Sequence, residues 1–444
     1  MEKSRKSIFG RILAWALRIV RWLAPGLGVK RWFVPILLGT TLIGIGLGVL
    51  ILDVYRRAPD TWWLPFLSAA SLRSLSRPLR AIIFGGLGTS LVLFGMWGLY
   101  RAILAPYRKP GRPVVEELAD HRRRDRGPRI VALGGGHGLS TLLRGLKNYT
   151  NNLTAVVSVA DDGGSSGRLR RTLGIPPPGD IRNCLAALSK DEALLTQLFQ
   201  YRFSGGGDGL QGHSFGNLFI SAMAEITGGF EDAVAESGRV LAVQGQVMPA
   251  TLHDVRLVAD VSLLHAPGEV RVEGESLIPK FPGSVRRVWL EPNNPPAYPK
   301  AIQAILAADM IVVGPGSLYT SILPNLLVPD IAAAMRASRA LKIYVSNVAT
   351  ESGETEGFTC GDYVRVIEEH VTGPLFDIVV QNNNFEGTLP EGVEWVRADP
   401  EQDTDYAVYL ANLVDQGTFW RHESAKLAEV LMDLYQERTG PLVE

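Results

Sequence analysis

The stretch Val156–Arg168, VVSVADDGGSSGR, decides the fold class of this chain. A short apolar run typical of a β-strand ends in two adjacent carboxylates, Asp161 and Asp162, and glycines and serines follow. α/β proteins build ligand sites from such loops at the carboxyl ends of parallel strands. Glycines let backbone amides turn toward a phosphate, and paired carboxylates can hold a metal ion or sugar hydroxyls. The stretch therefore predicts a site for an anionic, hydroxyl-rich ligand; the alternative is a tight surface turn with solvated acids.

Charge divides the 444-residue chain into two parts. Residues 1–129 contain 22 Lys and Arg but 7 Asp and Glu, whereas residues 130–444 contain 23 and 38. The first part also contains two uncharged runs of 20 residues, Phe33–Leu52 and Ala81–Tyr100, each long enough to cross a bilayer. Basic residues are densest before the first run and after the second, so a transmembrane hairpin over residues 33–104 is predicted, with both chain ends in the cytoplasm. The alternative is a pair of buried helices in a soluble core.

The rest of the basic part predicts further contact with the membrane. Residues 1–32 mix arginines with apolar residues, as an amphipathic helix on an anionic membrane surface does. Gly44 and Gly48 form a small-residue motif that favours helix pairing and hence a homodimer. Residues 105–128 are rich in charge and proline and are expected to form a linker. We therefore expect a multi-pass protein of the cell membrane with a cytoplasmic domain over residues 129–444 and no nucleic-acid partner.

The cytoplasmic part alternates strand-like apolar runs with helical periodicity, which predicts an α/β fold with a Rossmann-like, mainly parallel sheet. Short strand-like pieces separated by Gly and Pro between Val243 and Leu290 predict a small antiparallel insertion. The two cysteines, Cys184 and Cys360, belong to no metal-spaced cluster and fit a reduced compartment. The expected strands are residues 130–133, 153–160, 310–313, 341–345 and 378–381. The expected helices begin near 139 and cover 181–203, 215–226, 299–308, 331–340 and 419–438.

Two glycine loops follow predicted strands. Gly134–Leu139 leads from the first strand into a helix, where free amides and the helix dipole favour an anion. The loop matches the dinucleotide fingerprint only in part, and the chain has no P-loop lysine motif. Gly314–Ser321 repeats the arrangement after a later strand and adds hydroxyl groups. Both loops predict contacts to a phosphate or a nucleobase.

Several other polar residues have two interpretations. Asp180 is either a helix N-cap or a ligand contact, and Arg182 is either a bidentate phosphate contact or part of a surface ion pair. His213 and Asn217 lie one helical turn apart, so His213 is either a site residue or a capping or core histidine. The full set of expected ligand contacts is Gly134, Gly135, Gly136, His137, Gly138, Leu139, Gly163, Gly164, Ser165, Ser166, Asp180, Arg182, Asn183, Asn217, Gly314, Gly316, Ser317, Thr320, Ser321, Asn347, Thr350, Glu354 and Thr355.

These loops together resemble one known family. GGGHGLSTLLRGL, VADDGGSSGRLR, PPGDIRNCLAAL, GHSFGNLFI, ADMIVVGPGSLYTSILPNLLV and SGET are similar to the gluconeogenesis-factor family, within the CofD-like superfamily of 2-phospho-L-lactate transferases. The resemblance extends from about Ile130 to Glu369. It implies a Rossmann-like domain that binds a nucleotide-linked ligand.

Two functions remain open. The resemblance implies a regulatory protein that binds UDP-N-acetylglucosamine or a similar nucleotide sugar and is needed for cell shape and envelope growth on gluconeogenic carbon sources, with envelope-synthesis proteins as partners. The alternative is a transferase that uses a nucleoside-diphosphate-activated donor. In that case Asp161 and Asp162 would be catalytic and bind Mg²⁺, and His213 or His137 would act as the base.

Overall fold

The computed structural model describes residues 123–190, 192–205, 207–263, 268–398 and 407–439, with a few separate positions between 40 and 93. The chain divides into two units near Arg122. The expected amphipathic N-terminus, the spans 33–52 and 81–100 and the linker lie almost entirely outside the described residues. Among the described residues, no single helix combines the length and apolar character needed to cross a bilayer. Two consecutive segments, Leu318–Leu326 and Pro329–Ala337, have the required length and apolar character only when taken together, and the chain bends by 71° between them.

The main sheet has seven strands, all parallel, in the order β10-β9-β8-β7-β1-β2-β3. Ile130 of β1 is in register with Leu153 of β2 on one side and Met310 of β7 on the other. The chain builds outward from β1 through β2 to β3 and then returns to β7 on the other side of β1. Such a reversal of strand order opens a crevice at the carboxyl ends of the two central strands. The strands are β1 (Ile130–Gly134), β2 (Leu153–Val157), β3 (Gln246–Pro249), β7 (Met310–Val313), β8 (Leu341–Val345), β9 (Ile378–Asn382) and β10 (Ala407–Ala411).

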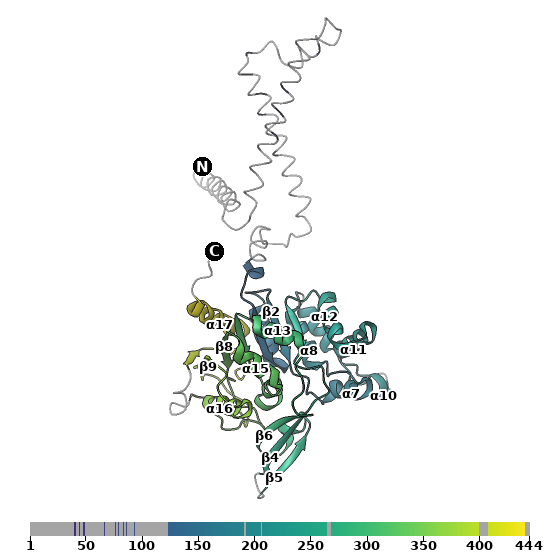
Figure 1. Ribbon diagram of the computed structural model, residues 1–444, viewed down its shortest axis with the longest axis vertical. Coiled ribbons are helices and arrows are strands. Elements are labelled where there is room, and N and C mark those ends of the chain that lie inside the picture. The colour runs from purple at the N-terminus through teal and green to yellow at the C-terminus, as the bar shows by residue number, and fades with distance from the viewer. Residues whose placement is uncertain are drawn as a thin grey trace, which may run out of the picture. The chain divides into compact units, whose positions relative to one another are not determined.

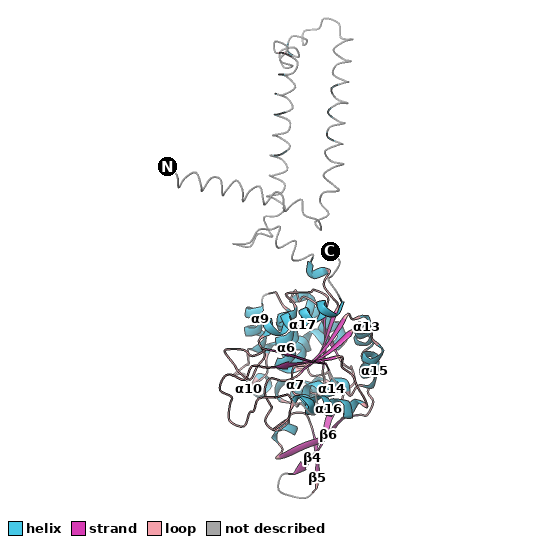
Figure 2. Cartoon of the chain, turned by 90° about the vertical axis from the view of Figure 1, so that its left-hand side faces the viewer, coloured by secondary structure: helices cyan, strands magenta, loops and turns pink. Residues whose placement is uncertain are grey.

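Helices cover both faces of this sheet. Because side chains alternate along a strand, Val131 and Leu133 enter one buried core while Ile130 and Ala132 enter the other. The first core is covered by α13 (Pro299–Ala307), α15 (Pro329–Ala337) and α16 (Cys360–Val371), and the second by α6 (Gly136–Leu146), α8 (Gly179–Leu188) and α17 (Ser424–Thr439). Figure 2 shows α6 and α13 on opposite sides of the strands. The remaining helices are α7 (Gly164–Leu173), α9 (Glu192–Gln200), α10 (Gly207–Leu210), α11 (Phe215–Thr227), α12 (Phe230–Val240), η2 (Ile278–Lys280), η3 (Leu318–Ile322) and α14 (Leu323–Leu326).

A second sheet of three antiparallel strands projects from the α/β layers (Figure 1). It has the order β5-β4-β6, with β4 (Arg256–Leu263), β5 (Glu269–Glu273) and β6 (Gly283–Glu291). The expected fold class is therefore confirmed for the described part: a mainly parallel sheet with a small antiparallel one. The insertion begins later than the expected residue 243, because β3 pairs in parallel with β2 and completes the main sheet. β3 is a four-residue edge strand with alternating burial, and so its sequence looks like a half-exposed antiparallel strand.

Several element boundaries follow from local signals. The expected strand 341–345 has the same bounds as β8, and the helix expected over 215–226 is α11. The closing helix begins at Ser424 and not at residue 419, because the Glu423 carboxylate accepts hydrogen bonds from the amides of Ala425 and Lys426 and so caps α17. β10, on the edge of the sheet, and α16 were not expected from the sequence.

The connection from β5 to β6 lies between two loops at the carboxyl edge of the main sheet. The Ser276 amide donates to Asp162 Oδ1 at 3.0 Å. On the other side, a Cβ added at Gly353 would lie 2.0 Å from the carbonyl oxygen of Pro279. The connection therefore contacts the loop after β2 and the loop after β8.

Candidate functional site

A cavity of about 440 Å³ lies at the carboxyl ends of β1, β7 and β8. This is the place where the strand order reverses, at which open parallel sheets bind ligands. The wall combines the first turn of α6, the loops after β7 and β8, and two segments from the last quarter of the domain. The lining residues are Gly135, Gly136, His137, Gly138, Thr141, Pro315, Gly316, Ser317, Ser321, Asn347, Val348, Ala349, Thr350, Glu351, Ser352, Pro390, Val393, Trp420, Arg421 and His422.

The first turn of α6 needs its glycines. Gly136 has a φ of +59°, a conformation that glycine adopts without strain. A Cβ added at Gly138 would lie 2.2 Å from the carbonyl oxygen of Pro315, so only glycine lets α6 begin directly against the loop after β7. The N-cap residue Gly135 has no side chain, and the Asp180 carboxylate takes up the first amide of the helix, that of Gly136. The other amides of the first turn and the positive end of the helix dipole face the cavity, which suits an anion.

The loops after β7 and β8 are tied together. Asn347 Oδ1 accepts a hydrogen bond from the Gly316 amide at 3.0 Å, and its Nδ2 donates to the Gly316 carbonyl at 3.1 Å. The Ser317 hydroxyl donates to Glu351 Oε2. Burial raises the pKa of the Glu351 carboxyl above its usual range. These contacts fix one polar wall of the cavity.

Trp420, Arg421 and His422 form a further part of the cavity rim, which sequence reasoning missed. Burial lowers the pKa of His422 to about 4, so its ring is neutral, and Nε2 donates to the Ser346 carbonyl at 3.1 Å. His137 also lines the cavity, and its pKa is lowered by burial and by the nearby Arg421. An aromatic residue beside an arginine after the last strand is the signal that could have pointed to this rim.

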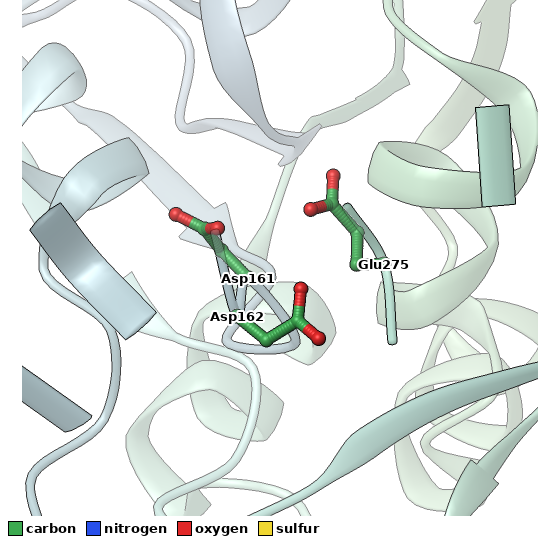
Figure 3. Close-up of side chains that lie close together, drawn as sticks. All are labelled: Asp161, Asp162 and Glu275. Atoms are coloured by element: carbon green, nitrogen blue, oxygen red, sulfur yellow. The ribbon is translucent and has the colours of Figure 1, made fainter. Parts of the chain in front are cut away.

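Three carboxylates lie close together near the end of β2. Oxygens of Asp161, Asp162 and Glu275 all lie within 4.8 Å of one another (Figure 3). Asp161 Oδ1 accepts from the Gly163 amide at 2.8 Å, which fixes the loop after the strand. Burial raises the pKa of Asp161, and burial together with Asp161 raises the pKa of Glu275 to about 8. Carboxylate oxygens are suitable ligands for Mg²⁺, which usually takes one or two carboxylates and completes its shell with water or phosphate oxygens.

Glu275 was not among the expected site residues. It lies in the connection from β5 to β6, and no motif in the surrounding sequence marks it as a ligand. Its neighbour Ser276 is bonded to Asp162 across 114 positions of sequence. Only the return of the antiparallel sheet to the loop after β2 brings Glu275 to this place.

Asp180 connects the carboxylate cluster with the cavity. A Cβ added at Gly135 would lie 2.6 Å from Asp180 Oδ2, and one at Gly179 would lie 3.1 Å from Asp161 Oδ2. Asp180 accepts a hydrogen bond from the Gly136 amide, and burial raises its pKa to about 6. The capping interpretation is wrong, because Pro178 occupies the N-cap of α8 and Asp180 lies in its first turn.

Behind Asp161 lies a buried hydrogen-bond network. Ser165 Oγ and His213 Nδ1 are bonded at 3.0 Å, and Asn217 Nδ2 donates to Ser165 Oγ at 3.1 Å and to Ser166 Oγ at 3.3 Å. Ser166 in turn bonds to Asp161. His213 is not among the residues that line the cavity, and its ring nitrogen Nδ1 is engaged with Ser165. The network holds the loop after β2 in place.

Arg182 is neither the phosphate contact nor the member of a surface ion pair that the sequence predicted. Its side chain is buried, and it donates to Ser214 Oγ at 2.6 Å and to Asn183 Oδ1 at 2.9 Å. It is neither in a surface ion pair nor among the residues that line the cavity. Ser214 is the N-cap of α11 and accepts from the Asn217 amide. Arg182 thus fixes the start of α11 against α8.

The other expected contacts divide into two groups. Glu354 and Thr355 are buried in internal hydrogen bonds: Glu354 accepts from Thr320 Oγ1 at 3.0 Å, and Thr355 Oγ1 accepts from the Glu351 amide at 2.9 Å. Burial and Glu351 raise the pKa of Glu354 to about 8. The expected residues that line the cavity are Gly135, Gly136, His137, Gly138, Gly316, Ser317, Ser321, Asn347 and Thr350. Those outside it are Gly134, Leu139, Gly163, Gly164, Ser165, Ser166, Asp180, Arg182, Asn183, Asn217, Gly314, Thr320, Glu354 and Thr355.

Comparison with known proteins defines the class. Residues 130–414 match the family model of the 2-phospho-L-lactate transferase CofD. A crystal structure of a Bacillus halodurans protein superposes with a TM-score of 0.64 at 41% identity, covering 69% of this chain and 99% of that one. The gluconeogenesis factor of Bacillus subtilis is 46% identical over 70% of this chain and 99% of its own. A Nostoc relative is 46% identical over 98% of this chain and 95% of its own.

The fold and the family model thus define a CofD-type α/β domain. The chain belongs to the gluconeogenesis-factor family. In the Bacillus relatives, nearly the whole chain is covered by the match. The domain is therefore a complete folding unit in this family.

Proposed function

We propose that this protein is a regulatory protein that binds a nucleotide sugar of the UDP-N-acetylglucosamine type. Its role is in cell shape and envelope growth under gluconeogenic conditions, and envelope-synthesis proteins are its partners. The observation that carries the proposal is the cavity of about 440 Å³ at the reversal of the strand order, lined by the glycine-rich first turn of α6. This volume is in the range of small-ligand sites, and a helix N-terminus favours a diphosphate.

We also propose that the domain is held at the cytoplasmic face of the cell membrane. Support comes from the two uncharged runs, Phe33–Leu52 and Ala81–Tyr100, and from the basic residues outside them. Pairing through Gly44 and Gly48 would give a homodimer. Cysteine accessibility in intact cells tests this, because single cysteines introduced at Ser4 and Ser68 should react with an impermeant maleimide only at the second position.

The binding proposal is tested with the purified full chain by titration calorimetry against UDP-N-acetylglucosamine, UDP, GDP, GTP and NAD. We expect heat of binding for the nucleotide sugar and no product by chromatography. Thr141 lines the cavity, and its hydroxyl donates only to its own helix at His137. Thr141→Trp should therefore block binding. Thr172 makes the same kind of helical bond to Arg168 on the exposed side of α7, so Thr172→Trp is the matched control. Unchanged binding by Thr141→Trp would exclude this cavity.

A second function is favoured by the carboxylate cluster: a Mg²⁺-dependent transferase acting on a nucleoside-diphosphate-activated donor. Asp161, Asp162 and Glu275 would hold the ion, which would supply charge stabilisation for a transferring phosphate. Of the two candidate bases, His137 is better placed, since it lines the cavity and its lowered pKa keeps the ring neutral. His213 remains the other candidate.

The two functions are separated by measuring nucleotide release with Mg²⁺ present. Release that Asp161→Asn abolishes and Glu273→Gln leaves unchanged would support the transferase, because Glu273 is an exposed carboxylate on β5 close to the cluster. Binding without release supports the regulatory protein. No binding of any nucleotide would contradict both.

A further inference from the structure

Among the described residues that line the cavity, Glu351 is the only carboxylate. It lies in the loop after β8, on the far side of α6 from the carboxylate cluster at the end of β2. It is partly exposed and therefore accessible from the cavity. A carboxylate beside a diphosphate site repels the phosphate charge. We therefore expect that another part of the ligand donates hydrogen bonds to this carboxylate.

The hydrogen bonds of Glu351 leave room for such a partner. Oε2 accepts from the Ser317 hydroxyl, and Oε1 accepts from Asn347 Nδ2 at 3.4 Å. An ionised carboxylate can accept about four hydrogen bonds, two at each oxygen. One acceptor position is thus open on each oxygen. Because Asn347 is itself held by two bonds to Gly316, the plane of the carboxylate is fixed before a ligand arrives.

The position of α6 divides a bound nucleotide sugar into two halves. Its N-terminus lies between the end of β2 and the end of β8, and it is the natural site of the diphosphate. The half toward β2 meets Asp161, Asp162 and Glu275, and the half toward β8 meets Glu351. The β8 half also has the aromatic and apolar side chains Trp420, Val348 and Val393, which suit a base. The nucleoside is therefore expected on the Glu351 side.

We propose that Glu351 accepts hydrogen bonds from the 2′- and 3′-hydroxyls of the ligand's ribose and so selects ribonucleotides over deoxyribonucleotides. This inference rests on the proposed nucleotide-sugar function. Two neighbouring hydroxyls supply two donors at the spacing of two carboxylate oxygens, and each oxygen has one open acceptor position. Hydrogen bonds to the charged form favour ionisation, so the ribose would offset the penalty that burial imposes on this carboxyl group.

The test uses titration calorimetry of the full chain with two ligand pairs, UDP and 2′-deoxy-UDP, and GDP and 2′-deoxy-GDP. We expect the wild-type protein to bind the ribonucleotide at least tenfold more tightly, which corresponds to about 1.4 kcal/mol. Glu351→Ala should bind both members of a pair with similar, weak affinity. Glu351→Gln keeps one acceptor oxygen and should discriminate less than the wild type.

Glu391→Ala is the matched control. Glu391 is an exposed carboxylate between Pro390 and Val393 at the cavity rim but is not itself a lining residue. Its removal changes the charge near the site without removing the proposed contact, so discrimination should persist.

Three outcomes would overturn the inference. Equal affinity of the wild-type protein for ribo and deoxy forms would do so without any variant. An equal loss for both forms in Glu351→Ala, with the ratio retained, would show that Glu351 does not contact the 2′-hydroxyl. If the wild type binds no nucleotide at all, the proposed function fails together with the inference, whereas the first two results leave nucleotide binding intact.

Discussion

The buried His422 is expected to make the domain sensitive to mild acid. Its pKa is lowered from 6.5 to about 4, chiefly by burial, while Nε2 donates to the Ser346 carbonyl. Since the unfolded chain binds the proton more tightly than the folded one, protonation favours unfolding. The contribution of the neutral ring to stability is therefore complete above pH 6.5 and is lost as the pH falls toward 4.

The size of the effect follows from these two pKa values. Between pH 7 and pH 5 the folded ring stays neutral while the unfolded ring becomes mostly protonated. The free energy of unfolding should fall by about 2 kcal/mol from this residue alone. His422→Gln keeps an N–H donor for the Ser346 carbonyl but does not titrate. The variant should therefore be less stable than the wild type at pH 7 by a constant packing term and should lose about 2 kcal/mol less on acidification.

The assay is urea unfolding of the unit Arg123–Val443, followed by tryptophan fluorescence at pH 7, 6 and 5. His253 is exposed, so His253→Gln serves as the control and should follow the wild-type pH dependence. If His422→Gln and the wild type lose the same free energy between pH 7 and pH 5, the histidine is not the titrating group and the argument from burial is wrong.

Three further predictions concern single contacts. Gly138→Ala should lower the free energy of unfolding by about 1–3 kcal/mol, because the added methyl group would lie 2.2 Å from the Pro315 carbonyl oxygen. Gly205→Ala is the control and should be near neutral, because a Cβ added there would meet nothing within 4 Å. Urea unfolding measures both variants. Gln381 is fully buried with both amide atoms unpaired, so Gln381→Met should raise the free energy of unfolding by about 1–3 kcal/mol, and a decrease would reveal a partner for the amide. Glu275→Gln should weaken Mg²⁺ binding at least tenfold in a thermal-shift titration, and an unchanged titration would place the ion elsewhere.

The loops of the site could be predicted because each carries its own local signal. The glycines of the first turn of α6 and of the loop after β7 mark backbone that must approach other backbone closely, and nine of the expected residues line the cavity. The parallel order of the strands follows from the alternation of strand and helix. Those features depend on residues within a few positions of one another.

What could not be predicted depends on long-range topology. Glu275 reaches Asp161 only because the antiparallel sheet returns to the end of β2, and Trp420 reaches the cavity from beyond β10. Burial likewise decides between roles that the sequence leaves open. Arg182 resembles a phosphate ligand, but its guanidinium is taken up by Ser214 and Asn183. Asp180 resembles a helix cap, but Pro178 already occupies that position.

The connection between β5 and β6 sets a limit on how this family can vary. It contacts Asp162 through the Ser276 amide and fits against Gly353 of the loop that carries Glu351. The backbone of Gly353 packs directly against the backbone of Pro279. No side chain lies between them that could change its conformation to accommodate a longer or shorter connection. Insertions in homologous chains are therefore expected at the distal end of the antiparallel sheet, while residues 274–281 keep a constant length. A homologue that lacks the sheet would have lost Glu275 from the carboxylate cluster and the backbone that packs against the loop carrying Glu351.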